Sequence, residues 1–143
     1  MNLSKYMNLT EGEESVQEVE GDAYNSDSNP IARMIGTIIR IISIILGFRK
    51  KTHIIVTNKR VIRIDFEKIL WVINKGVSAI SMTPRSINNV GYSNIRTFLI
   101  FKTRYFMMGT SGGDTFIKFQ GNDKSLFEAV DNVNNTLEKI ITK

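Results

Sequence analysis

Apolar residues fill residues 30–46 almost without interruption, and both ends of this run carry helix-boundary signals. Asn29 suits the N-cap, Pro30 suits the first helical position, and Gly47 suits the C-terminal exit. The pattern therefore predicts a helix over residues 30–46. At 100° per residue the centre of its apolar face consists of Met34, Ile35, Ile38, Ile42 and Ile45, and Arg33 and Arg40 lie on the narrower polar arc.

This helix is shorter than the roughly 20 apolar residues that a bilayer span needs, and it carries two arginines in its body. Crossing a membrane is therefore disfavoured. Two placements stay open. The apolar face packs against the rest of the fold, as most apolar stripes do, and we favour this placement. Alternatively, the helix lies in a membrane interface while its arginines and residues 49–51 reach anionic headgroups.

After residue 51 the pattern changes to short runs rich in Ile, Val, Phe and Thr, separated by turn residues. The predicted strands cover residues 52–57, 60–66, 69–74, 77–83, 86–92, 96–108 and 115–120. Asn58 and Lys59 form the turn between the first two. Residues 15–24 are compatible with a further short strand, and residues 124–141 form an amphipathic helix with Asp123 as its N-cap.

Residues 1–14 show no apolar period and are expected to form a disordered acidic leader, ahead of one domain over residues 15–143 that includes the helix at 30–46. The chain of 143 residues is large enough to bury a core without disulfides, and it contains no cysteine. The N-terminus has no secretory signal pattern, so we expect a cytoplasmic protein or one that is peripheral on the inner face of the membrane.

Charge is distributed unevenly along the chain. Residues 1–29 hold one lysine and seven acidic residues, whereas residues 30–143 hold 18 basic and seven acidic residues. A basic body of this kind attracts the phosphates of lipid or nucleic acid. The alternative is a solvated basic surface that the acidic leader partly neutralises.

No catalytic or metal-binding motif stands out. His53 is the only histidine and begins an apolar strand, so a structural or surface role is expected. Glu18 and Glu20 lie in a segment without the ligand spacing of a calcium loop, and Ser111-Gly112-Gly113 lacks the ending of a phosphate-binding loop. We expect no enzyme activity, no metal and no cofactor.

Seven short strands followed by one amphipathic helix are typical of a strongly bent antiparallel sheet or barrel whose open end is covered by the helix. Residues 55–62 (IVTNKRVI), residues 84–92 (PRSINNVGY) and the hairpin-then-helix ending resemble bacterial pleckstrin-homology-like (PH-like) domains. Gly21-Asp22 and residues 29–33 and 47–51 are further similar to an uncharacterised bacterial subgroup with a helix before the domain. The resemblance covers residues 15–141.

The resemblance implies an α+β, mainly β fold and a binding scaffold, because PH-like domains engage phosphoinositides, membranes, peptides or copies of themselves. Lys59, Arg60 and Arg63 match only part of the headgroup-binding pattern of eukaryotic members. We therefore expect a non-catalytic module that engages an anionic membrane surface or a protein partner. The candidate contact residues are Arg33, Arg40, Arg49, Lys50, Lys51, Lys59 and Arg60.

Two alternatives remain for the partner. Basic and aromatic residues alternate over residues 96–106, so an open sheet face there would stack single-stranded nucleic acid, unless Phe98, Phe101 and Phe106 belong to the core. No RNA-binding signature accompanies them, which makes nucleic acid the weaker alternative. A free sheet edge would instead support self-assembly into a homo-oligomer by strand addition.

Overall fold

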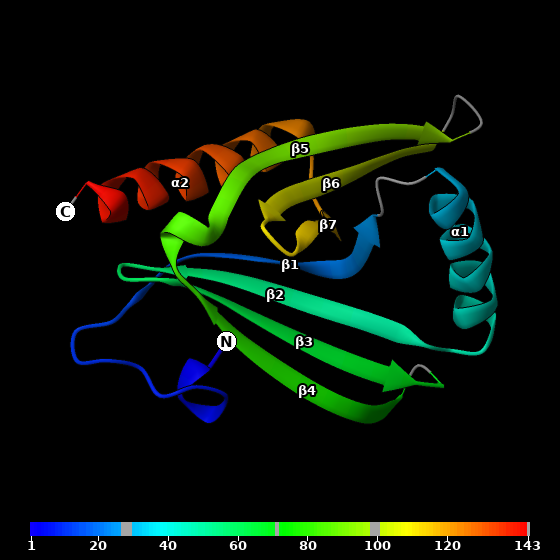
Figure 1. Cartoon of the computed structure of the whole chain (residues 1–143), viewed down its shortest axis with the longest axis horizontal. Coiled ribbons are helices and arrows are strands. Elements are labelled where there is room, and N and C mark those ends of the chain that lie inside the picture. The colour runs from blue at the N-terminus through cyan, green and yellow to red at the C-terminus, as the bar shows by residue number, and fades with distance from the viewer. Residues whose placement is uncertain (27–29, 71, 98–100, 143) are drawn as a thin grey trace.

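The structure is a computed structural model, and it describes residues 1–26, 30–70, 72–97 and 101–142. Seven antiparallel strands form one sheet in the order β4-β3-β2-β1-β7-β6-β5 (Figure 1). The strands are β1 (Ser15–Ser26), β2 (Arg49–Thr57), β3 (Val61–Ile69), β4 (Ile73–Met82), β5 (Ile87–Thr97), β6 (Phe101–Thr110) and β7 (Gly113–Lys118). The helices are α1 (Pro30–Ile45) and α2 (Asp123–Ile141), with short 3₁₀ turns at η1 (Leu3–Lys5) and η2 (Pro84–Ser86).

The sheet bends within β1. The first part of β1 pairs with β2 as far as Asp22, and from Ala23 onward β1 pairs with β7. At the corner, Gly21 lies so close to β7 that a Cβ atom there would overlap the carbonyl oxygen of Lys118. Because β4 and β5 remain at the two edges in the described part of the sheet, the barrel is bent but not closed.

The hydrophobic core lies between the concave face of the sheet and α2 (Figure 1). Alternate residues of the strands point inward, and α2 covers them with the apolar stripe that its sequence predicts. The fully buried side chains of this core include Ile54, Val56, Val61, Phe106, Met108, Ile117, Leu126 and Val133. This arrangement confirms the predicted α+β, mainly β fold, a bent seven-stranded sheet with a C-terminal helix.

Some predicted boundaries were wrong. The N-cap of α2 is Asn122, whose Oδ1 accepts a hydrogen bond from the Ser125 amide at 2.8 Å, and Asp123 is the first helical residue. The predicted strand at 69–74 is divided in the structure: Ile69 ends β3, the chain turns at Leu70 with φ +50°, and β4 begins at Ile73. From there β4 continues without a break through most of the predicted strand at 77–83, as far as Met82. The run at 96–108 is divided between β5 and β6, and residues 98–100 lie outside the described residues.

Residues 15–24 form most of a full central strand rather than a short one. The reason is that β1 alone has neighbours in both halves of the sheet.

The segment before β1 packs on the convex face of the sheet, where the pattern predicts a disordered leader. Leu3 is buried in a second cluster with Ile55, Ile62 and Ile64, and Tyr6 packs edge-on against Phe66 at 5.4 Å between ring centroids. Ile55 of β2 and Ile62, Ile64 and Phe66 of β3 face outward and are apolar, and the N-terminal segment covers them.

Helix α1 covers residues 30–45, one residue fewer than predicted, and its C-terminus is capped by the predicted glycine. Gly47 has φ +75°, the Gly47 amide donates to the Ile44 carbonyl, and the Phe48 amide donates to the Ser43 carbonyl. These two bonds make a Schellman C-cap. The predicted N-cap, Asn29, lies outside the described residues.

Candidate functional site

The described apolar side chains of α1 are largely exposed to solvent. Among the described side chains of α1 and the residue after it, Ile35, Ile38, Ile39, Ile41, Ile42, Ile44, Ile45 and Leu46 are 48–69% exposed. The favoured prediction, that this helix packs against the strands, is therefore wrong for the described residues. Figure 1 shows α1 standing beside one end of the sheet, on the side opposite the free end of α2. The apolar stripe indicates that these side chains should be buried against another surface, but it does not indicate which surface that is.

Further exposed apolar residues lie on the same side of the molecule. Leu70, Val72 and Ile73 flank the turn between β3 and β4, and this turn adjoins the end of α1, since a Cβ on Gly47 would lie 2.6 Å from the Leu70 Cα. The end of β5 and the start of β6 lie on the same side in Figure 1, and Phe101, the first residue of β6, is 67% exposed. We call α1 together with Leu70, Val72, Ile73 and Phe101 the apolar end.

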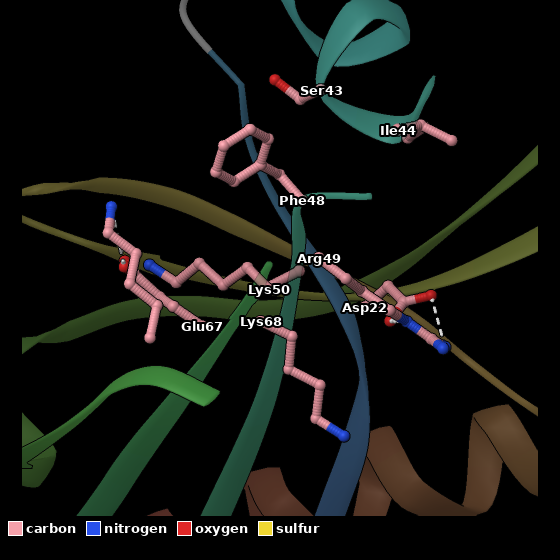
Figure 2. A pocket seen from close by; sticks show the side chains of 10 residues that line it. Asp22, Ser43, Ile44, Phe48, Arg49, Lys50, Glu67 and Lys68 are labelled. Carbon is pink, nitrogen blue, oxygen red and sulfur yellow. Dashed lines mark hydrogen bonds and ion pairs between the residues drawn. The ribbon is translucent and has the colours of Figure 1, made fainter. Parts of the chain in front are cut away.

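A cavity of about 500 Å³ lies between the C-terminal part of α1 and the sheet (Figure 2). Ser43, Ile44 and Phe48 line it from the side of the helix. The sheet side of the cavity carries charged residues, and these are Asp22, Arg49, Lys50, Glu67, Lys68 and Lys75. Four cations and two carboxylates give the lining a net positive charge.

Several of these cations are already paired within the protein. Arg49 donates from Nε and Nη2 to the two carboxylate oxygens of Asp22, at 2.5 and 3.0 Å. The Lys50 Nζ lies 3.0 Å from Asp65. Lys75 is 3.9 Å from Glu67 and largely exposed, and no ion pair of Lys68 occurs within the described residues. Lys68 and Lys75 are therefore the cations of this cavity that are most available to an external anion.

Asp65 organises a polar network in the mouth of the barrel. Its carboxylate accepts hydrogen bonds from Thr52 at 2.5 Å and from the Arg63 guanidinium at 3.0 Å, and Arg63 also donates to Thr115 at 2.8 Å. Burial alone would raise the pKa of Asp65, but the hydrogen bonds from Thr52, Arg63 and Lys50 outweigh it and lower that pKa. The inner face of the barrel thus changes from apolar beneath α2 to ionic at the end near α1.

Lys59 and Arg60 lie at the other end of the β2–β3 hairpin. At about 3.3 Å per residue, the nine residues of β2 separate them from Arg49 by roughly 25–30 Å. Arg60 donates to the Glu13 carboxylate at 2.8 and 3.0 Å, and the Lys59 ammonium donates to the Glu11 carbonyl. Both residues therefore hold the N-terminal segment in place, and Lys59 is also exposed to solvent.

The seven predicted contact residues therefore do not form one patch. Lys51 lies near the base of α1 but pairs with Glu20 at 3.2 Å. Arg33 and Arg40 belong to α1, but their side chains lie outside the part of the chain that the structure describes. Sequence reasoning identified the helix and its flanking cations, but it did not identify Lys68, Lys75 or the apolar turns beside them. Their spacing along the chain carries no signal for this proximity.

The basic and aromatic run expected to stack nucleic acid is divided between the core and the surface. Phe106 is fully buried in the core, Phe101 is 67% exposed, and Phe98 lies outside the described residues. Lys102 and Arg104 both pair with Asp123 at the start of α2, at 2.5 and 2.6 Å. Their positive charge therefore supports the docking of α2 against β6.

No helix in the described residues is long and apolar enough to cross a membrane. The chain matches no protein-family model and no curated protein in sequence. Among solved structures it is similar to the crystal structure of a DUF1696 family protein with a pleckstrin-homology domain from Shewanella loihica PV-4. The identity is 20%, the TM-score is 0.43, and the match covers 82% of this chain and 98% of that one. The strand number, the bend and the C-terminal helix agree with the PH-like fold that the resemblance implied.

Proposed function

We propose that this protein is a non-catalytic PH-like module that docks on an anionic membrane surface through its apolar end. The observation that supports this proposal most directly is the orientation of α1. Ser43 lines the cavity beneath the helix, while Ile35, Ile38 and Ile42 are about half exposed to solvent. A helix that is apolar around most of its surface is normally buried, so this one requires a cover outside the described fold.

The dimensions of α1 suit an interfacial position. Its 16 residues extend about 24 Å at 1.5 Å per residue, which is too short to span and long enough to lie flat in the headgroup region. Interfacial helices bury their apolar face roughly 5–10 Å deep. The exposed Leu70 and Val72 would enter the same layer, because the β3–β4 turn adjoins the end of α1.

Positive charge around the apolar end favours an anionic surface over a neutral one. Lys68 and Lys75 line the cavity, and Arg96 is exposed near the end of β5. A basic residue close to an anionic leaflet contributes on the order of 1 kcal/mol, and salt screens this contribution. In this proposal, insertion of the apolar side chains into the membrane provides most of the binding free energy. The cations make the protein prefer an anionic surface to a neutral one.

Vesicle recruitment tests the proposal. The full chain should co-sediment with phosphatidylcholine vesicles that contain phosphatidylglycerol, and recruitment should fall as salt is raised. The double variant Ile38→Glu/Ile42→Glu should lose recruitment while remaining folded, because both side chains are exposed. The matched control Val16→Glu/Ile141→Glu places the same charges on exposed apolar positions outside the apolar end and should bind normally.

Charge reversal separates the electrostatic contribution. Lys68→Glu/Lys75→Glu should weaken recruitment to anionic vesicles and leave the weak binding to neutral vesicles unchanged. Lys124→Glu/Lys139→Glu on α2 is the control, since both residues are exposed and neither belongs to the apolar end or lines the cavity. Equal binding to neutral and anionic vesicles, or no binding at any salt concentration, would contradict the proposal.

A second copy of the chain is the other candidate partner that would bury the exposed apolar side chains of α1. The edge strand β4 supports it, because most of its residues are exposed and Lys75 is its only charged residue, so the edge is poorly protected against strand addition. Light scattering coupled to size exclusion tests this candidate. A dimer that Ile38→Glu/Ile42→Glu converts to a monomer would favour it over membrane docking.

A further inference from the structure

Three side chains on the convex face of the sheet converge at the pairing of β1 with β2. Glu18 and Glu20 are two residues apart on β1, so both point to the same face. Glu20 lies directly opposite His53 of β2 in the strand register, and Glu18 is the diagonal neighbour of His53. His53 is 33 residues from Glu20 and 35 from Glu18 in the sequence, and the register of β1 and β2 brings the three side chains together.

The distances suit a shared ligand. The His53 Nδ1 lies 2.8 Å from the Glu18 Oε1 and 3.3 Å from the Glu20 Oε2, and one ligand atom from each of the three residues lies within 4.8 Å of the others. In a tetrahedral zinc site with bonds of about 2.0–2.2 Å, neighbouring ligand atoms are about 3.4 Å apart. Small side-chain adjustments would therefore place all three around one ion.

The position of the histidine is set by its surroundings. His53 is only 8% exposed, and its ring packs edge-on against Phe66 at 5.4 Å between centroids. This packing holds the ring where Nδ1 faces the two carboxylates. Glu18 and Glu20 remain more accessible, with side chains 30% and 54% exposed, so an ion can reach the group from solvent.

Two cations now neutralise the carboxylates. The Lys51 Nζ lies 3.2 Å from the Glu20 Oε2, and the amine of Met1 lies 3.3 Å from the Glu18 Oε2. A divalent ion would compete with both. The Coulomb interaction of Lys51 with a bound ion is repulsive, so removal of the Lys51 charge should strengthen metal binding rather than weaken it.

We propose that Glu18, Glu20 and His53 form a site for a divalent transition-metal ion of the Zn²⁺ class. One imidazole nitrogen and two carboxylate oxygens match the ligands that Zn²⁺ accepts, with water completing the coordination. Ca²⁺ prefers six to eight oxygen ligands and should bind poorly. The site is distinct from the apolar end and does not depend on the membrane proposal.

Isothermal titration with zinc chloride, on the full chain without an affinity tag, tests the site. We expect one ion per chain and an increase in the temperature of unfolding with zinc, because an ion that binds the folded state stabilises it. Glu20→Gln and His53→Gln should each weaken binding more than about tenfold, since even outer-shell partners of a metal ligand contribute about 10- to 100-fold. Glu14→Gln, an equal charge change at an exposed position, should bind as the parent does.

Lys51→Gln distinguishes a specific site from general attraction to acidic groups. It should increase zinc affinity, and calcium chloride should give no comparable shift in unfolding temperature for the parent. Circular dichroism would confirm that each variant is folded. Absence of binding by the folded parent protein, or unchanged affinity in folded His53→Gln, would overturn the proposal.

Discussion

The carboxylate of Glu13 joins the N-terminal segment to the β2–β3 turn. It is buried and accepts hydrogen bonds from the Arg60 guanidinium at 2.8 and 3.0 Å and from the Thr57 hydroxyl at 2.9 Å. The Thr10 amide donates to the same carboxylate at 2.9 Å. The Arg60 hydrogen bond is the largest influence, and together these donors lower the pKa of Glu13 to about 2.

Replacing Glu13 should therefore change both the stability and its pH dependence. Glu13→Gln is expected to lower the free energy of unfolding at pH 7 by about 1.5–3 kcal/mol, the range for hydrogen bonds to charged groups. Since the pKa is about 2 in the folded protein and near 4.5 in the unfolded chain, this stabilisation is present above pH 5 and is lost as the pH falls towards 2.

Urea unfolding of the parent and of Glu13→Gln at pH 7 and pH 3 measures this prediction. The gap in unfolding free energy between the two proteins should narrow at pH 3. Glu14→Gln serves as the control because Glu14 is exposed. A gap that stays constant between the two pH values would show that the ionised carboxylate is not what stabilises this contact.

Single residues were partly predictable from the sequence. Asn58 and Lys59 were identified as a turn because Asn tolerates tight-turn geometry, and the structure places them between β2 and β3. The partners of Arg60 and His53 could not be predicted, because they lie 47 and 35 residues away in the chain. Asn122 and Asp123 are both acceptable N-caps, and local preference does not distinguish them.

At the scale of elements, Gly47 determines how α1 joins β2. Its φ of +75° favours glycine, and a Cβ would lie 2.6 Å from the Leu70 Cα and 3.0 Å from the Leu70 amide nitrogen. Gly47→Ala should destabilise the fold by about 1–3 kcal/mol through backbone strain and this overlap.

Chemical denaturation of Gly47→Ala tests that cost, with Gly76→Ala as the matched control. Gly76 lies in β4, on the hairpin that Gly47 contacts through Leu70, but a Cβ on Gly76 would meet nothing within 4 Å. Identical unfolding free energies for the two variants would contradict the role assigned to Gly47.

The sequence predicted the ends of elements that carry local boundary signals, but it did not predict what those elements pack against. The extent of α1 follows from its proline and glycine, both of which act within one turn of helix. No local sequence signal predicts that the described apolar side chains of this helix are exposed. In the same way, residues 69–74 carry strand-forming residues, but the chain reverses at Leu70, which has a positive φ that a leucine seldom adopts.

At the scale of the whole molecule, the N-terminal segment acts as a second layer on the convex face of the sheet. Leu3 is 6% exposed and contacts the cluster of Ile55, Ile62 and Ile64. Leu3→Ala should lower the free energy of unfolding by about 2–3 kcal/mol, towards the low end of buried leucine truncations because the cluster is small.

Leu9→Ala is the matched control for this layer, since Leu9 is exposed and should cost little. Thermal or urea unfolding of the two variants provides the comparison. Equal stability of both variants would show that the segment contributes no apolar cover.

The acidic N-terminal residues and the basic residues that follow them form ion pairs with each other in the fold. Composition suggested an acidic leader and a basic body available to an anionic partner. In the fold, Glu13 pairs with Arg60, Glu20 with Lys51, and Asp22 with Arg49. Residues 1–29 thus neutralise part of the basic excess, in line with the alternative of a partly neutralised basic surface, and this pairing depends on strand register, which composition does not report.

The corner at Gly21 has a consequence for how the protein loses its structure. Because β1 exchanges hydrogen bonds with β2 before the corner and with β7 after it, we expect the two halves of the sheet to unfold together. Amide protons on both sides of the corner should therefore exchange with deuterium only through global opening, and calorimetry should record a single cooperative transition.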